Sequence, residues 1–189
     1  MSTQPSDPLS GATLAAAIGV FEKQKKLGER AIAQLDDEQL FLVIDPDANS
    51  VATIVKHIAG NMRSRWSDFL TTDGEKPDRN RDGEFVIAAH ERTRDAVVGW
   101  WNSGWQILMS TLASLKPADL TSTVLIRGEK MPAIAAIFRQ IDHYGQHVGQ
   151  LVLLAKHMKG ADWQTLSIPK GKSAEVDAKF RAQMAAQQG

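Results

Sequence analysis

Histidines are the residues of this 189-residue sequence whose spacing points most directly to chemistry. His143 and His147 lie four positions apart in a segment with helical periodicity. Residues i and i+4 of a helix project from the same face one turn apart, so these two imidazoles can bind one metal ion. A third ligand is required, and His57 in another helical segment is the best candidate. Three imidazoles with open coordination positions would form a catalytic metal site.

The spacing of His143 and His147 is equally typical of a solvated helix flank. On a helical wheel, both residues lie well away from the apolar stripe that contains Ile141 and Val148. His57 likewise lies off the centre of the apolar face of its own segment. Helix geometry alone therefore allows a solvent-exposed surface as readily as a cleft that binds metal.

Four arginines form a second group of residues that could bind a ligand. Guanidinium groups bind carboxylates and phosphates through paired hydrogen bonds. The alternative is local ion pairing with the acidic residues that are interspersed among the arginines, and we favour it. The arginines are Arg63, Arg65, Arg79 and Arg81, and the acidic residues are Asp68, Asp73, Glu75, Asp82 and Glu84.

Composition restricts the chemistry further. The sequence has no cysteine, which excludes disulfides, thiolate metal ligands and a cysteine nucleophile. A thiol reaction would therefore need a thiol supplied from outside the protein. No Gly-rich phosphate loop follows a predicted strand, and no nucleophile elbow surrounds a serine. The 22 basic and 22 acidic residues balance, which argues against nucleic-acid binding.

The elements that must position these residues are four amphipathic helices. Apolar residues recur at helical spacing over residues 14–35, 51–70, about 82–115 and 132–157. A polar loop spans residues 71–82, and a short strand at 121–126 with a turn at 127–128 precedes the last helix. Trp66, Trp101 and Trp105 have core spacing, whereas Trp100 points elsewhere. The pattern predicts an all-α protein, a four-helix bundle.

The two ends of the chain are polar. We expect residues 1–9 to form a loose arm and residues 160–189 a polar tail, with one domain over residues 1–189. No apolar run approaches the roughly 20 residues that span a bilayer. The first residues have neither the basic start nor the apolar stretch of a signal peptide. These features predict a cytoplasmic protein that does not bind membranes.

Four segments together resemble a known family. They are residues 55–66 around His57, the loop at 73–77 with 79–82, the segment Asp-His-Tyr-Gly-Gln-His-Val-Gly-Gln at 142–150, and the tail at 163–173. These segments resemble the DinB/YfiT-like superfamily, and more narrowly a bacterial subgroup of it that is labelled a domain of unknown function. The likeness covers residues 14 to 173.

This resemblance implies a four-helix bundle that holds a divalent metal, often zinc or nickel, through three histidines and a water molecule. The matching residues here are His57, His143 and His147. Characterised relatives are similar to metal-dependent transferases that add low-molecular-weight thiols, such as bacillithiol, mycothiol or glutathione, to electrophilic small molecules. The four arginines are then weaker candidates for binding the thiol or the substrate. The superfamily also implies a homodimer.

Two other functions stay open at this point. One is a non-catalytic binding or stress-associated assembly protein, in which the loop and tail motifs form a dimer interface and any metal is structural. The other is metal-dependent hydrolysis by bound hydroxide, which needs the same three ligands. An open coordination position facing a cleft would favour an enzyme, whereas a closed metal site would favour the binding protein.

Overall fold

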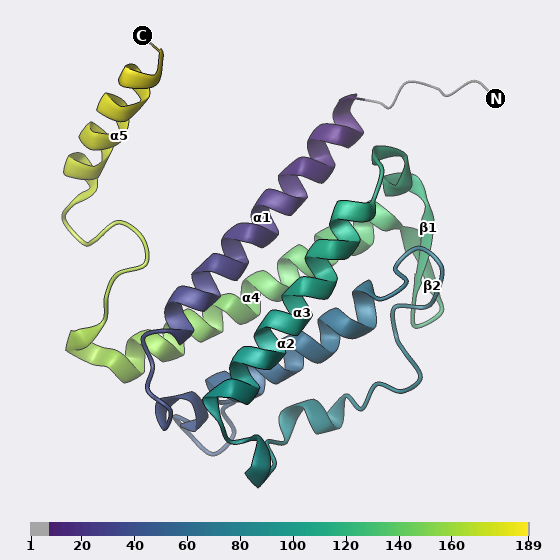
Figure 1. The fold of residues 1–189 in the computed structure, drawn as a ribbon, viewed down its shortest axis with the longest axis horizontal. Coiled ribbons are helices and arrows are strands. Elements are labelled where there is room, and N and C mark those ends of the chain that lie inside the picture. Colours follow the sequence, from purple (N-terminus) through teal and green to yellow (C-terminus); the bar gives the residue numbers. More distant parts are fainter. Residues whose placement is uncertain (1–7, 189) are drawn as a thin grey trace.

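Helices dominate the structure, a computed structural model that describes residues 8–188. Its long helices are α1 (Pro8–Ile32), α2 (Val51–Trp66), α3 (Arg94–Ser114) and α4 (Ala133–Lys159), joined by short 3-10 turns and one β-hairpin, and followed by α5 (Ser173–Gln188). Helix α2 packs against α3 and α4, and α1 packs against α4 and α3 (Figure 1). The protein is therefore mostly helical, as expected.

The core between α1, α2, α3 and α4 contains large aromatic side chains. Trp66 and Trp105 are fully buried, and Trp101 is almost so, which confirms the core positions predicted for them. The ring of Phe21 meets the ring of Trp66 edge to face, with centroids 5.7 Å apart. Trp100 is only half buried, and the ammonium of Lys56 lies 5.3 Å from its ring centroid. Trp100 thus packs at the edge of this core, rather than pointing away from it as the sequence predicted.

Helix α2 begins where the sequence predicts, but it ends at Trp66 rather than near residue 70. The Ser50 hydroxyl accepts a hydrogen bond from the backbone N–H of Thr53 at 3.1 Å, so Ser50 caps the helix. The predicted end near residue 70 is wrong, because Ser67 is extended and Asp68 has a φ of 51°. Phe69 nevertheless packs on Trp66, with ring centroids 5.1 Å apart. This contact explains why the apolar spacing continues beyond the helix.

Helix α3 starts at Arg94, about ten residues later than the predicted start at 82–84. The hydroxyl of Thr93 accepts a hydrogen bond from the backbone N–H of Ala96 at 3.1 Å and caps the helix. Residues 82–91 instead form two 3-10 turns, Asp82–Phe85 and Ala89–Glu91, separated by extended backbone at Val86. The first turn packs against α2 and proves important for the site described below.

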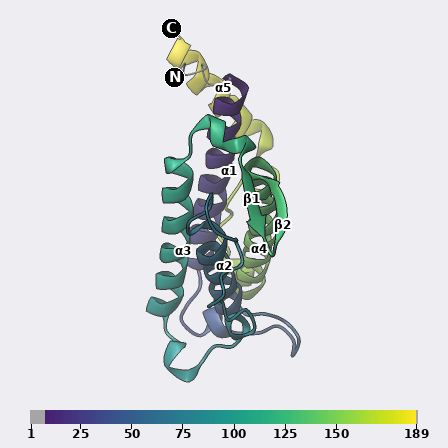
Figure 2. The same cartoon turned by 90° about the vertical axis from the view of Figure 1, so that its right-hand side faces the viewer.

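The predicted strand and turn before the last helix are present. Strands β1 (Thr123–Ile126) and β2 (Glu129–Pro132) pair antiparallel around a turn at Arg127 and Gly128. Both turn residues have positive φ, 56° and 76°, as a two-residue hairpin turn of type I′ requires. The hairpin contacts α4 and lies on the side of the molecule opposite α3 (Figure 2).

The two predicted polar ends differ from the expectation. Residues 1–7 of the expected arm lie outside the described residues, and Pro8 and Leu9 belong to α1, which ends at Ile32 rather than near residue 35. The tail contains helix α5, which the sequence analysis did not predict and which stands apart from α1–α4 (Figure 1). Among the described residues, no helix is long and apolar enough to cross a membrane.

Candidate metal centre

The structure brings together the three histidines that the sequence singled out. His57 comes from α2, and His143 and His147 come from α4. Each offers one ring nitrogen, and these three atoms all lie within 4.8 Å of one another. Centroids of the rings are 5.5 Å apart for His57 and His143, 5.0 Å for His57 and His147, and 4.7 Å for His143 and His147. Such a group can hold a single metal ion.

Burial distinguishes this cluster from a solvated helix flank. The His57 residue is 4% exposed, although it lies off the centre of the apolar face of α2. His143 and His147 are half buried. Polar side chains seldom lie this deep without a partner or a ligand, so the cluster is not a solvated helix flank.

The electrostatic environment keeps two of the imidazoles neutral, as metal ligands must be. Burial lowers the pKa of His143 to about 3, with smaller contributions from the nearby His147 and His57. Burial also lowers the pKa of His147. A neutral ring nitrogen presents a lone pair to a cation, so both groups are in the ligating form near pH 7.

Hydrogen bonds orient two of the three rings. Nδ1 of His57 lies 2.9 Å from Oε2 of Glu84, and Nδ1 of His147 lies 2.8 Å from Oε1 of Gln150. A nitrogen that faces an oxygen acceptor carries the proton, which leaves Nε2 of each ring for a metal. Nδ1 of His143 is buried and has no hydrogen-bond partner in the described structure. This unsatisfied buried atom fits a site that a cation completes.

The arginines are held mainly by acidic neighbours. Arg79 makes two hydrogen bonds to the Glu84 carboxylate, from Nε at 2.7 Å and from Nη2 at 2.9 Å. Arg65 donates to Glu75 at 2.9 Å and to the carbonyl of Gly74. These contacts agree with the local ion pairing that the sequence analysis favoured.

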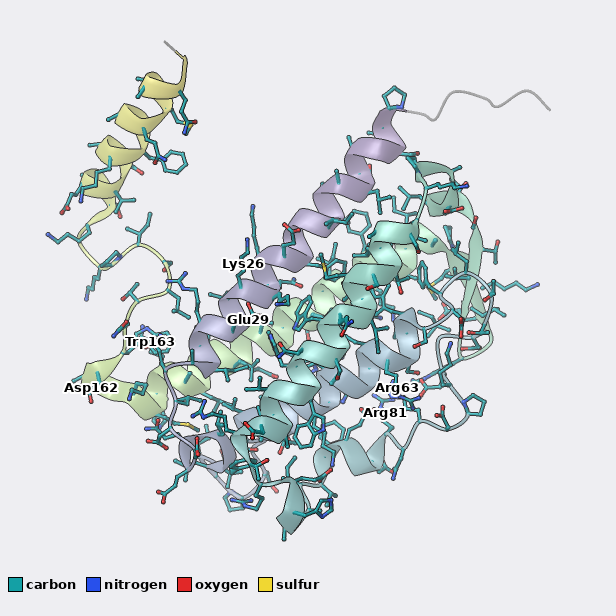
Figure 3. All side chains as sticks on the ribbon, in the orientation of Figure 1. Lys26, Glu29, Arg63, Arg81, Asp162 and Trp163 are labelled. Atoms are coloured by element: carbon teal, nitrogen blue, oxygen red, sulfur yellow. The ribbon has the colours of Figure 1, made fainter. Side chains whose placement is uncertain are left out.

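Arg63 and Arg81 lie further out, near the end of α2 and the loop that follows it (Figure 3). Arg63 pairs with Asp78 at 2.9 Å, and both side chains are exposed. Arg81 is exposed as well. Of the four arginines, these two are therefore the ones that solvent and small molecules can reach.

Sequence reasoning missed Glu84 as a residue of the site, naming it only as an ion-pair partner for arginines. Glu84 is 6% exposed, and it contacts both His57 and Arg79. Burial raises the pKa of Glu84, but hydrogen bonds from Arg79 and His57 outweigh burial and hold that pKa below its ordinary value. Histidine ligands commonly donate to a carboxylate, yet no spacing rule shows which acidic residue of a loop does so.

A comparison with protein families identifies the family of this chain. A family model described as "Protein of unknown function (DUF1572)" matches residues 9–172. The chain belongs to the DUF1572 family. The match to DUF1572 includes the three histidines, Glu84 and the hairpin, and it ends just before α5. No match was found among curated proteins.

Proposed function

We propose that this DUF1572 protein is a divalent-metal-dependent enzyme that transfers a low-molecular-weight thiol to an electrophilic small molecule. The observation that supports it is the cluster of His57, His143 and His147, with ligand atoms within 4.8 Å of one another. The proposal includes the DinB/YfiT-like four-helix bundle, which agrees with the side-by-side packing of α1–α4.

Zinc and nickel are the proposed metals, because imidazole nitrogen suits both ions. Within residues 8–188, no fourth His, Asp or Glu joins the cluster of three. Three protein ligands are typical of catalytic zinc sites, which keep one position for water or substrate. A divalent metal in such a site lowers the pKa of a thiol or water bound at that position.

The protein's own residues would support thiol transfer in three ways. Burial of His57 limits the access of water, and the depressed pKa of His143 keeps its ring nitrogen neutral. Because the sequence has no cysteine, the nucleophilic thiol must be a separate molecule. Exposed Arg63 and Arg81 are the proposed contacts for a carboxylate of the thiol or substrate, whereas Arg65 and Arg79 are engaged with Glu75 and Glu84.

Metal content tests the proposal first. Elemental mass spectrometry on tag-free protein should find about one metal ion per chain, and the double variant His143→Ala/His147→Ala should lose it. His157→Ala is the matched control, because His157 is an exposed histidine on the same helix. Absence of metal from the unmodified protein, even after incubation with zinc and nickel, would overturn the proposal and favour a binding or assembly protein.

Activity assays then separate the candidate reactions. Metal-loaded protein should accelerate conjugation of a thiol such as glutathione to a model electrophile such as 1-chloro-2,4-dinitrobenzene, and the double histidine variant should not. Hydrolysis of ester or amide substrates by the same preparation, without thiol transfer, would favour the hydrolase instead. The proposed homodimer is checked separately by light scattering of the purified chain.

A further inference from the structure

We propose that Glu84 is a positioning residue of the metal centre, held in place by Arg79 and by the absence of a side chain at Gly60. Its role is to fix the ring of His57 so that Nε2 faces the metal. This inference rests on the proposed metal centre. It gives the segment before α3 the role of orienting His57.

The contacts of His57 define what Glu84 does. Oε2 of Glu84 lies 2.9 Å from Nδ1 of the ring, and both side chains are almost fully buried. Phe85, the next residue, stacks on the same ring with centroids 4.8 Å apart and an interplanar angle of 29°. The carboxylate selects the form of the imidazole with a proton on Nδ1, and the stacked ring opposes rotation of the imidazole.

Arg79 fixes the carboxylate itself. Its guanidinium donates to both oxygens of Glu84, at 2.7 and 2.9 Å, and the Arg79 side chain is only 2% exposed. A paired contact of this kind sets the plane of the carboxylate as well as its position. It also balances the negative charge, which would otherwise be costly to bury beside α2. Arg79 further lies 3.6 Å from Glu75, which accepts hydrogen bonds from Arg65 and Arg127.

Gly60 provides the space that Glu84 needs. Gly60 lies on α2, three residues after His57. A Cβ atom built on Gly60 would lie 2.3 Å from Oε1 and 2.6 Å from Cδ of Glu84. Any side chain at this position would therefore push the carboxylate away from its present place. Because Glu84 is also tied to Arg79, the movement would lengthen or break the bond to His57.

Two variants test this role, and the first of them leaves every charged group in place. Gly60→Ala displaces the carboxylate, and its matched control is Gly99→Ala, a helical glycine of α3 whose added Cβ would meet nothing within 4 Å. Glu84→Gln keeps an oxygen that can accept from Nδ1–H of His57 but weakens the contact with Arg79. We expect Gly60→Ala to weaken zinc binding 10- to 100-fold, Glu84→Gln to weaken it less, and Gly99→Ala to leave it unchanged.

Two readouts go beyond activity. Competition titration with a chelating dye gives the zinc affinity, and the absorption spectrum of the Co²⁺-loaded protein reports ligand geometry. Nitrogen NMR of the metal-free protein identifies which ring nitrogen of His57 carries the proton. The unmodified protein should show the proton on Nδ1, and Gly60→Ala should show a mixture of the two forms.

The outcomes separate this inference from the proposed function. If the unmodified protein binds no zinc, the metal centre fails, and NMR alone still decides whether Glu84 orients His57. If the unmodified protein binds zinc and both Gly60→Ala and Glu84→Gln bind it as tightly as Gly99→Ala, the positioning role is overturned. A proton on Nε2 of His57 in the unmodified protein overturns it too. Circular dichroism checks folding, and if Gly60→Ala does not fold, Glu84→Gln decides.

Discussion

The indole N–H of Trp66 donates a hydrogen bond to the hydroxyl of Tyr144 at 3.0 Å, across 78 positions of sequence. The same hydroxyl donates to Oδ1 of Asn61 at 2.9 Å. All three side chains are buried. Because Asn61 lies one turn after His57 and Tyr144 directly follows His143, these bonds join α2 to α4 next to the candidate metal centre.

Removing this hydroxyl should destabilise the protein. Tyr144→Phe leaves the N–H of Trp66 and the amide oxygen of Asn61 buried without their present partner. We expect the free energy of unfolding in urea to fall by about 1–3 kcal/mol. Gln146→Ala, an exposed change on the same helix, should cost less than about 0.5 kcal/mol. Equal stabilities of the two variants would contradict the importance of this contact.

Two glycines of α1 should respond in opposite directions to the same substitution. A Cβ on Gly28 would lie 2.2 Å from Cη2 of Trp101, so Gly28→Ala forces the indole to move and should cost about 1–3 kcal/mol. A Cβ on Gly19 meets nothing within 4 Å. Gly19→Ala should therefore stabilise the helix by about 0.5–1 kcal/mol. Thermal unfolding of both variants provides the measurement, and a stabilised Gly28→Ala would refute the packing argument.

The stability of the metal-free protein should depend on pH through its histidines. The pKa of His143 is about 3 in the folded protein and 6.5 as its ordinary value, so between these values the unfolded chain binds a proton that the folded chain does not. Stability therefore falls as the pH drops below 6.5 and is fully recovered above it. The lowered pKa of His147 acts in the same direction.

Urea denaturation in the presence of a chelator, between pH 7 and pH 5, measures this effect. Most carboxylates stay ionised in this window, but glutamates whose pKa is lowered in the folded protein, such as Glu75, Glu84 and Glu91, add a contribution of the same sign near pH 5. The free energy of unfolding should rise with pH, with a slope below about 1.4 kcal/mol per pH unit for each histidine, since both rings are partly exposed. His143→Gln should reduce the slope, and an unchanged slope would show that its ring titrates normally in the folded protein.

Helix α5 should contribute little to the stability of the rest of the chain. Its ion pairs are local, from Glu175 to Lys172 and Lys179. In the preceding segment, by contrast, the carbonyl of Leu166 accepts a hydrogen bond from Arg30 of α1, and the carbonyl of Gln164 accepts one from Gln34, just beyond α1. Truncation after Lys172 should change the free energy of unfolding by less than about 0.5 kcal/mol.

Truncation after Lys159 is the informative comparison. It also removes half-buried Trp163, labelled in Figure 3, and half-buried Leu166, so it should destabilise measurably. Chemical denaturation of both truncated chains tests the difference. A large loss from the shorter deletion would mean that α5 supports the folded chain.

Most elements could be predicted from the sequence because their determinants are local. The period of apolar residues locates α2, α3 and α4, Ser50 caps α2, and the Arg127–Gly128 turn closes the hairpin. The predicted end of α2 was wrong because Phe69 packs on Trp66 beyond the helix, and this tertiary contact continues the helical spacing of apolar residues. Helix α5 was missed because it has only three large apolar residues, Val176, Phe180 and Met184, and none of them is fully buried.

The candidate metal centre depends on long-range contacts as well as on local sequence patterns. Sequence alone determined that His143 and His147 share a helix face, because that depends only on 3.6 residues per turn. It also determined that no cysteine takes part. Whether those histidines face solvent or a third ligand depended on how α2 packs against α4, which is a long-range contact. The choice of Glu84 as the partner of His57, across 27 positions, was likewise decided by tertiary structure, since irregular loops have no period from which such a contact could be calculated.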